Sequence, residues 1–427
     1  MNTGSEAQDG PASHSGPPAA AGPGPDDDRA IGNQGLQTER GRIWAGTMAG
    51  HEAMRGFRTA HIDSFASVTE PHGKHGEYRG PRFDPDQRVL TREAREQAEE
   101  HMLAPGATRS RGAGNRFTDE EPDELRTCFE RDRDRILHST SFRRLAGKTQ
   151  VFIFPEDHQR TRLTHALEVA QVATSIASAL RLNVTLAEAI ALGHDCGHGP
   201  AGHASEDALA GFLPEGFDHA LWGADVSLAG LNLCKETLDG IRNHSWSRPA
   251  PETPEGEVVS WADRIAYVCH DWEDAVSTGI VSPSMLPLEV QKRCGTERSR
   301  QLGAFIHGIV TATASTGRIC MDEELADALA VFRRVDYENI YLRPASVTQG
   351  AAVVEVLRGL VEYFSDRPNA VPSARDAGVA AGSEAATRIA VTYVAGMTDR
   401  FAMVAAVSEL GWDPARLPQG VGDWRRR

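Results

Sequence analysis

The 427-residue sequence lacks long hydrophobic runs and has few cysteines. No apolar stretch approaches the roughly 20 residues that a membrane-spanning helix needs, so we expect no membrane segment. The polar N-terminus lacks the basic-then-apolar pattern of a secretory leader. The cysteines form no CxxC pair, which argues against a zinc knuckle or a disulfide framework and predicts reduced thiols in a cytoplasmic protein. They are Cys128, Cys196, Cys234, Cys269, Cys294 and Cys320.

Positive charge is also scarce, since the formal net charge is -15. This balance argues against general binding to nucleic acid or to anionic membranes. Basic side chains are nevertheless concentrated in one stretch, which suggests a small anionic substrate. The alternative is an arginine-rich helix face in water, and the sequence leaves both open. The residues are Arg131, Arg133, Arg135, Arg143, Arg144, Lys148, Arg160 and Arg162.

The chain has three parts by composition. Residues 1–40 are mostly Gly, Pro, Ala, Ser and Asp, so we expect a disordered tail. Residues 41–115 are polar and predict an irregular extension with one short helix near Thr91–Leu103. Residues 116–427 carry one helical pattern after another, which predicts an all-α catalytic domain with a core at about 160–280.

Within this domain, Leu163–Leu182 is apolar nearly all round and predicts a buried central helix. Thr185 and Glu188 resemble a capping box for a helix that ends at His194, before a glycine-rich turn. Gln150–Phe154 is the best strand candidate. Further helices are predicted at Leu228–His244, Val258–Ser277, Arg300–Thr313, Glu323–Ile340, Val347–Phe364 and Glu384–Leu410.

Two imidazoles and two carboxylates stand out because they lie in apolar, helix-forming surroundings. His165, the doublet His194–Asp195 and Asp263 form a donor set that suits a divalent metal. Such groups are costly to bury unless something compensates them. Taken singly, His165 could be an ordinary core histidine, and Asp263 could belong to the wet face of an amphipathic helix. Together they predict a metal site.

The turn after His194 adds more titratable groups. His198, His203 and His219 can exchange protons near neutral pH, and Glu206 lies three residues after His203, where it can orient an imidazole. The alternatives are turn hydrogen bonding for His198 and plain surface exposure for His219. Tyr267 lies one helical turn after Asp263 and would face the same pocket.

The order of these residues resembles the HD-domain metallohydrolases, and more narrowly the deoxyguanosine triphosphate triphosphohydrolase group. The resemblance covers roughly residues 125–410, and six motifs in the family's order make it specific. They are FERDRDRILHSTSFRRLAGKTQVF, DHQRTRLTHALEVAQVA, GHDCGHGPAGHASE, GLNLCKETLDGIRNHSW, ADRIAYVCHDWEDA and YVAGMTDRFA.

The resemblance implies an all-α HD-domain helical bundle, elaborated by further C-terminal helices, that hydrolyses a deoxynucleoside triphosphate to deoxynucleoside and inorganic triphosphate. It implies a divalent metal on His165, His194, Asp195 and Asp263, with Mg, Mn, Co, Fe and Zn not distinguished. The implied catalytic residues are His203, Glu206, His198 and His219. The implied substrate-binding residues are Arg162, Lys148, Arg264, Tyr267 and Asp271.

The implied partners are a nucleotide substrate, a nucleotide activator and further copies of the chain; single-stranded nucleic acid stays unsupported. Two other functions remain open. One is an HD-type phosphohydrolase acting on monophosphates or guanosine polyphosphates, and the other is a catalytically silent nucleotide-sensing regulator. The sequence does not say which deoxynucleotide is preferred.

Overall fold

The computed structural model describes residues 53–54, 57–58, 89–153 and 159–418. The chain divides into two units, Met1–Val89 and Leu90–Arg427. In the first unit, β1 (Ala53–Met54) pairs antiparallel with β2 (Phe57–Arg58). The predicted disordered tail, residues 1–40, and most of the predicted extension lie outside the described residues.

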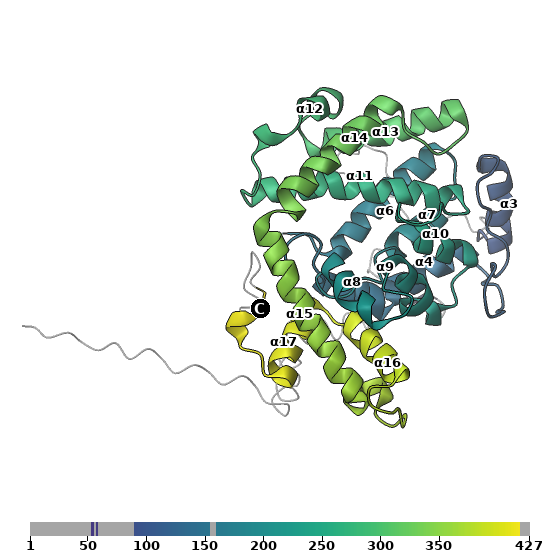
Figure 1. Cartoon of the computed structure of the whole chain (residues 1–427). Helices are drawn as coiled ribbons and strands as arrows, with labels where there is room; N and C mark the ends of the chain where they lie inside the picture. The colour runs from purple at the N-terminus through teal and green to yellow at the C-terminus, as the bar shows by residue number, and fades with distance from the viewer. Residues whose placement is uncertain (1–52, 55–56, 59–88, 154–158, 419–427) are drawn as a thin grey trace, which may run out of the picture. The chain divides into compact units, whose positions relative to one another are not determined.

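The second unit is built from helices, which confirms the all-α prediction (Figure 1). Its helices are α3 (Arg92–Met102), α4 (Cys128–His138), α5 (Thr140–Arg144), α6 (Arg162–Ala179), α7 (Val184–Gly193), α8 (His203–Leu209), α9 (His219–Trp222), α10 (Lys235–Asn243), α11 (Pro254–Ser277), α12 (Leu288–Cys294), α13 (Arg298–Thr316), α14 (Glu323–Asp336), α15 (Pro344–Asp366), α16 (Glu384–Ala395) and α17 (Asp399–Leu410).

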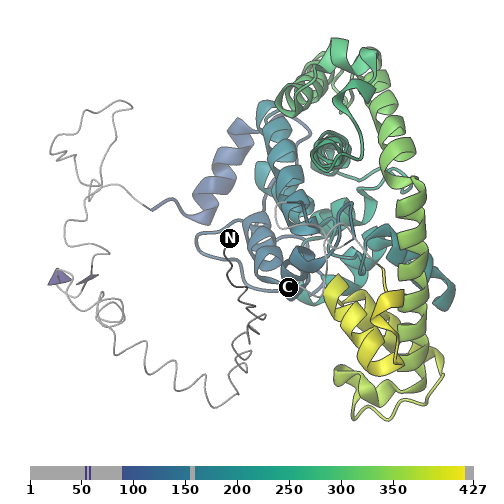
Figure 2. The same cartoon turned by 90° about the vertical axis from the view of Figure 1, so that its left-hand side faces the viewer.

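The first hydrophobic core forms around α6, α7 and α11. Helix α6 packs on both α7 and α11, and it therefore buries apolar side chains on more than one face, as its sequence predicted. Val169, Val172 and Ile176 are completely buried there. Figure 2 shows α11 nearly end-on with other helices around it, which explains why most of its residues are buried.

A second hydrophobic core joins α8 to α15, α16 and α17. Leu209 from α8 and Leu357 from α15 both belong to it, and α15 extends from the end of α14 down to α16 and α17 in Figure 1. The chain between His194 and Leu209 passes from one core to the other, because Cys196 belongs to the first and Ala201 to the second.

Two local predictions were wrong. Helix α7 is capped by Asn183, whose side chain accepts a hydrogen bond from the Leu186 amide, so Thr185 does not form the cap. The described part of the expected strand at Gln150–Phe154 consists of bends. Its neighbour Thr149 binds the Asp399 carboxylate through its backbone amide and joins Thr161 only by an isolated bridge, so no strand partner aligns with this segment.

Three predicted helices are shorter than expected or interrupted. Asn232 adopts a left-handed conformation (φ 50°), so α10 begins only at Lys235. Helix α14 ends at Asp336 and continues as one π-helical turn. The long pattern at 384–410 is split after Ala395, because Thr398 caps a new helix by accepting a hydrogen bond from the Phe401 amide.

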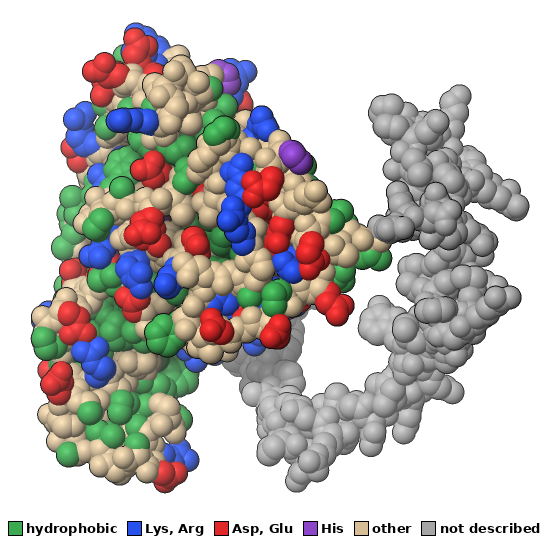
Figure 3. All heavy atoms as spheres, turned by 90° about the vertical axis from the view of Figure 1, so that its right-hand side faces the viewer, with side chains coloured by type: hydrophobic (Ala, Val, Ile, Leu, Met, Phe, Trp, Pro, Cys, Tyr) green, Lys and Arg blue, Asp and Glu red, His purple; other side chains and the backbone are tan. Residues whose placement is uncertain are grey.

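Much of the basic stretch is paired locally. Arg131 and Arg135 form ion pairs with Glu120, and Arg133 pairs with Asp134 and Glu188; these contacts favour the solvated-helix interpretation for the three arginines. Acidic and basic side chains are also interspersed over the face shown in Figure 3. All six cysteines are free, and no helix among the described residues is long and apolar enough to cross a membrane.

Candidate functional site

Three packed helices bring the four predicted metal ligands together. His165 lies on α6, Asp263 on α11, and the His194–Asp195 doublet directly follows α7. His165 Nε2 is 3.1 Å from Asp263 Oδ1; His194 Nε2 is 3.7 Å from that oxygen and 3.4 Å from Asp195 Oδ1. All four side chains are buried. The wet-face alternative for Asp263 is therefore wrong.

The turn after α7 needs glycine at two positions. A Cβ atom at Gly197 would lie 2.0 Å from the His219 carbonyl oxygen, so only glycine allows this close approach. Gly202 has φ +62°, and a Cβ there would lie 2.4 Å from Arg162 Nη2. The glycine-rich sequence thus lets the turn fold tightly against both Arg162 and His219.

The donor set fits a divalent cation. His194 Nδ1 donates a hydrogen bond to the Ala191 carbonyl (2.6 Å), which leaves Nε2 with a lone pair. This buried Nε2 atom has no hydrogen-bond partner in the part of the chain that the structure describes. An orphaned buried acceptor costs free energy unless a ligand satisfies it, and a backbone bond that orients a ligating imidazole is typical of metal sites.

Both ligand carboxylates also bind an arginine through their second oxygen. Arg162 Nη1 lies 2.7 Å from Asp195 Oδ2, and Arg264 Nη1 lies 2.7 Å from Asp263 Oδ2. Burial alone would raise the pKa of Asp195, but Arg162 and the nearby imidazoles outweigh it and hold this pKa well below its usual range. The pKa of Asp263 is likewise lowered, because hydrogen bonding to His165 and the Arg264 charge outweigh burial.

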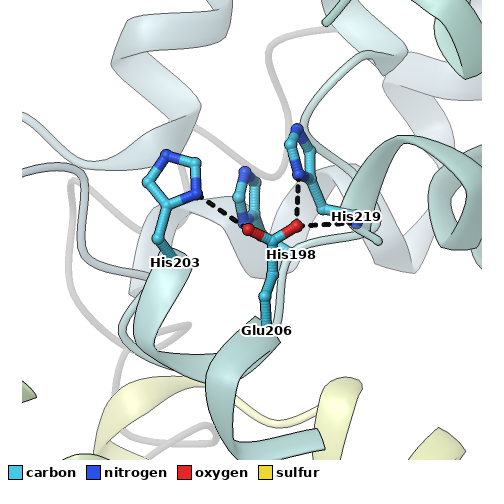
Figure 4. A group of neighbouring side chains, drawn as sticks. All are labelled: His198, His203, Glu206 and His219. Atoms are coloured by element: carbon cyan, nitrogen blue, oxygen red, sulfur yellow. Dashed lines mark hydrogen bonds and ion pairs between the residues drawn. The ribbon is translucent and has the colours of Figure 1, made fainter. Parts of the chain in front are cut away.

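Figure 4 shows a second group of side chains, which adjoins the candidate metal ligands through the contact between His198 and Asp195. The Glu206 carboxylate joins two histidines: Oε2 lies 2.9 Å from His203 Nδ1, and Oε1 lies 2.7 Å from His219 Nδ1. His198 stacks on His219 with ring centroids 3.8 Å apart, and its Nε2 lies 3.2 Å from Asp195 Oδ1. Surface exposure does not describe His219, because it is buried.

This group is better suited to proton transfer than to a second metal. Donor atoms of His198, His203, Glu206 and His219 all lie within 4.8 Å of one another. However, the stacked rings of His198 and His219 are only 13° from parallel, so their nitrogens do not point toward one centre. Burial and Arg162 lower the pKa of His198, whereas the Glu206 carboxylate outweighs burial and raises the pKa of His219.

His244 belongs to this site and was missed. It lies at the C-terminal end of α10, and its Nε2 is 3.2 Å from His219 Nε2. Its ring centroid is 5.0 Å from that of His194. Burial and the neighbouring imidazoles lower its pKa to about 3. The motif GIRNHSW contains this histidine. Nothing in the sequence, however, places it next to His219 and His194, which lie 25 and 50 positions upstream.

Lys148 lies near the site but faces backbone carbonyls. Its ammonium donates to the His198 carbonyl and to the Ala395 carbonyl at 3.1 Å. Burial lowers its pKa to about 8. Asp399 makes a parallel link, since its carboxylate accepts hydrogen bonds from the Thr149 and Ala201 amides. Lys148 therefore connects the His198 turn to α16, and its contact with a substrate stays a prediction.

Two of the predicted substrate-binding residues, Tyr267 and Asp271, lie further along α11. Tyr267 accepts a hydrogen bond from Arg333 Nε at 2.7 Å. Asp271 binds Arg160 through Oδ1 and Tyr341 through Oδ2. Arg160 was noted only as one of the residues of the basic stretch, and Tyr341 was assigned no role. Both oxygens of Asp271 are thus engaged, and a ligand hydroxyl would have to share or replace one of these contacts.

Comparison with known proteins identifies the class. The HD domain family matches residues 162–268, which include all four candidate metal ligands, and the phosphohydrolase-associated domain matches residues 319–406. The site and these matches define an HD-domain phosphohydrolase. A solved phosphohydrolase structure from Bacteroides thetaiotaomicron is 15% identical, with a TM-score of 0.41 over 64% of this chain and 69% of that one.

Curated relatives identify the family. A deoxyguanosinetriphosphate triphosphohydrolase-like protein of Caldanaerobacter subterraneus subsp. tengcongensis is 40% identical over 74% of this chain and 94% of its own length. Proteins with the same name from Clostridium perfringens and Desulfatibacillum aliphaticivorans are 41% and 36% identical, over 66% and 74% of this chain and 86% and 96% of theirs. The chain therefore belongs to the deoxyguanosinetriphosphate triphosphohydrolase-like family.

Proposed function

We propose that this phosphohydrolase cleaves deoxynucleoside triphosphates to deoxynucleoside and inorganic triphosphate. The observation that carries the proposal is the convergence of His165, His194, Asp195 and Asp263 beside the hydrogen-bonded group of His203 and Glu206. A divalent ion held by the first four would supply Lewis-acid chemistry at the scissile phosphate. Family membership supports the proposal, since the curated relatives carry this activity in their names.

Arg162 and Arg264 have the charge and position to bind the phosphates. Each guanidinium uses one N–H for a ligand carboxylate, and each Nε is buried without a partner among the described residues. Guanidinium groups match phosphate oxygens geometrically. Because catalysis at phosphorus depends mainly on positioning and charge stabilisation, these two side chains would orient and neutralise the triphosphate.

His203 is the best placed group for proton transfer. Glu206 accepts a hydrogen bond from its Nδ1–H, which leaves Nε2 free to take or give a proton. The side chain is 73% exposed, so Nε2 is accessible, whereas His219 and His198 are held inside. We infer that His203 exchanges the proton and that the Glu206 carboxylate, which also binds His219, orients it.

Tyr267 and Asp271 are proposed to contact the deoxyribose. Burial raises the pKa of Tyr267, so its hydroxyl stays neutral at physiological pH. A ring in this position would crowd a ribose 2′-hydroxyl. The expected selectivity is for deoxynucleotides over ribonucleotides.

The test is product analysis with purified protein, Mn²⁺ and each of the four dNTPs, alone and with a second dNTP as activator. The expected products are deoxynucleoside and intact triphosphate, with GTP turned over much more slowly than dGTP. Release of pyrophosphate or single phosphate would refute the reaction. Turnover of monophosphates or guanosine polyphosphates in a parallel panel would favour an HD-type phosphohydrolase that acts on these other nucleotides. Metal binding without turnover of any nucleotide would favour a nucleotide sensor.

A further inference from the structure

Arg264 lies between two aromatic rings. Its Cζ atom is 4.9 Å from the ring centroid of Trp246 and 5.8 Å from that of Tyr267. A guanidinium is attracted to the face of an aromatic ring, and most strongly to tryptophan. Tyr267 is already part of the candidate substrate site, but nothing in the metal centre or the proton-transfer group involves Trp246.

The polar contacts of Arg264 do not fix its orientation. Among the described residues it makes a single hydrogen bond, from Nη1 to Asp263 Oδ2 at 2.7 Å. One such bond leaves a planar group free to turn about the donor, whereas a ring against its face restricts the plane. Since Arg264 is buried and its Nε lacks a partner among the described residues, its orientation decides where the remaining N–H groups point.

Trp246 is itself held in place. It follows α10 two residues after His244, and its ring packs edge-to-face on Trp261 of α11, with centroids 5.0 Å apart and planes at 78°. The residue is nevertheless 51% exposed, so only part of its surface packs against the protein. Trp261 thus supports Trp246, which covers Arg264.

We propose that Trp246 is a positioning residue that holds the Arg264 guanidinium in the orientation in which it meets the anionic substrate. The inference rests on the proposed function for the nature of that substrate, a triphosphate. Trp246 acts through Arg264 and touches no reacting atom. Its contribution is therefore to affinity for the phosphate chain and to the orientation of that chain at the metal centre.

The experiment measures binding of inorganic triphosphate to the full chain by calorimetry at fixed free Mn²⁺. Trp246→Leu should weaken binding about 5-fold, whereas Trp246→Phe, which keeps a ring, should stay within about 2-fold of wild type. The matched control is Trp412→Leu, since Arg416 lies 5.5 Å above the Trp412 ring on another part of the chain. This control should leave binding unchanged.

A double-mutant cycle tests whether Trp246 acts through Arg264. In an Arg264→Leu background, Trp246→Leu should cause no further loss. Equal losses in both backgrounds, or a Phe variant as weak as the Leu variant, would overturn the inference. If Trp246→Leu does not fold, tetrafluorotryptophan at this position keeps the shape but weakens the ring's negative face. Binding should then fall about 3-fold, and unchanged binding would also overturn the inference.

Binding and turnover separate this inference from the proposed function. A wild-type chain that binds triphosphate with the expected coupling, but releases other products from dNTPs, would refute the reaction and retain the role of Trp246. Release of intact triphosphate from dNTPs, without coupling between Trp246 and Arg264, would retain the reaction and refute the role of Trp246. A wild-type chain that does not bind triphosphate would overturn the role of Trp246, whereas the reaction would still be decided by product analysis.

Discussion

The two halves of the candidate site differ in how they are built. The metal half consists of His165, His194, Asp195 and Asp263, all buried and carried by helices of the first hydrophobic core. The proton-transfer half consists of His203, Glu206 and His219, carried by α8 and α9, and His203 is 73% exposed. Close packing and buried ion pairs with Arg162 and Arg264 fix the first half, whereas hydrogen bonds to the single carboxylate of Glu206 fix the second. We therefore expect the two halves to respond differently to substitution.

The largest effect is expected in the metal half. Asp195→Ala removes one ligand and the partner of Arg162, which leaves a buried guanidinium without its carboxylate. Mn²⁺ binding should be lost, and dNTP hydrolysis should fall by about 10³-fold or more. Metal content by elemental analysis and triphosphate release measure this. Asp207→Ala, an exposed position on α8, is the control; wild-type Mn²⁺ affinity in the Asp195 variant would contradict the ligand assignment.

The next largest effect separates the halves. Glu206→Gln keeps the size of the side chain but removes the charge that orients His203 and His219. The turnover number should fall by about 10² to 10⁴-fold, while Mn²⁺ affinity stays within about 3-fold. Steady-state kinetics and calorimetry on one preparation measure both. Asp207→Asn controls for charge on the same helix. Loss of Mn²⁺ binding in the Glu206 variant would show that the two halves are not independent.

A smaller effect is expected at Asp399, which links the segment after Lys148 to the turn before His203. Asp399 accepts hydrogen bonds from the Thr149 amide at 2.8 Å and the Ala201 amide at 2.7 Å, inside the structure. Asp399→Ala leaves these two amides and the Thr149 hydroxyl, which also donates to Asp399, without their acceptor, so the free energy of unfolding should fall by about 2–4 kcal/mol and turnover by about 10-fold. Urea unfolding measures the change in the free energy of unfolding. Asp413→Ala, which removes an exposed cap from Ala415, should cost less than about 1 kcal/mol; equal losses would contradict the argument.

The smallest effect concerns a buried carboxyl that belongs to neither half. Asp336 has no hydrogen-bond partner among the described residues, and burial, with the nearby Asp271 carboxylate, raises its pKa to about 9 against the opposing charge of Arg160. Tyr341 and Cys269 also lie close to it, and both have raised pKa values. Asp195 and Asp263 show the opposite shift, since they face cations.

Stability should therefore depend on the ionisation of Asp336. Its folded-state pKa lies above the unfolded value, so its contribution is fully present below about pH 4 and is lost as the pH rises toward 9. Asp336→Asn removes this loss and should raise the free energy of unfolding by about 1–3 kcal/mol at pH 8, with little gain at pH 5. Thermal unfolding across this range measures it. A gain in the free energy of unfolding that does not change with pH would contradict the raised pKa of Asp336.

The sequence predicted the helices well where one periodic pattern continued and poorly where side chains ended it. The buried helix at 163–182 was predicted because it is apolar on all faces, and it is α6. The breaks at Asn232 and Thr398 depend on contacts of single side chains, such as the Asn232 amide on the Thr118 carbonyl. The expected strand near residue 150 failed because the Thr149 amide binds a carboxylate 250 positions away.

The site residues likewise divide into those that the sequence predicted and those that only tertiary contacts bring together. The candidate ligands could be grouped because they recur at helical spacings and the motifs are specific; the structure clusters His165, His194 and Asp195 and places Asp263 Oδ1 3.1 Å from His165 Nε2. His244 could not be assigned, because its contact with His219 arises only when α10 packs beside α9. Arg160 and Tyr341 meet at Asp271 from segments 111 and 70 positions away, a proximity that no local pattern encodes.

The exposure of His203 gives the site a gradient of effective dielectric constant. The metal ligands lie where water is excluded, so charges there interact strongly, whereas His203 lies at the high-dielectric end. A proton taken up by His203 can pass to bulk water without crossing the metal centre. In the proposed reaction, charge stabilisation and proton exchange would occupy opposite ends of one site, each in the solvent environment that favours it.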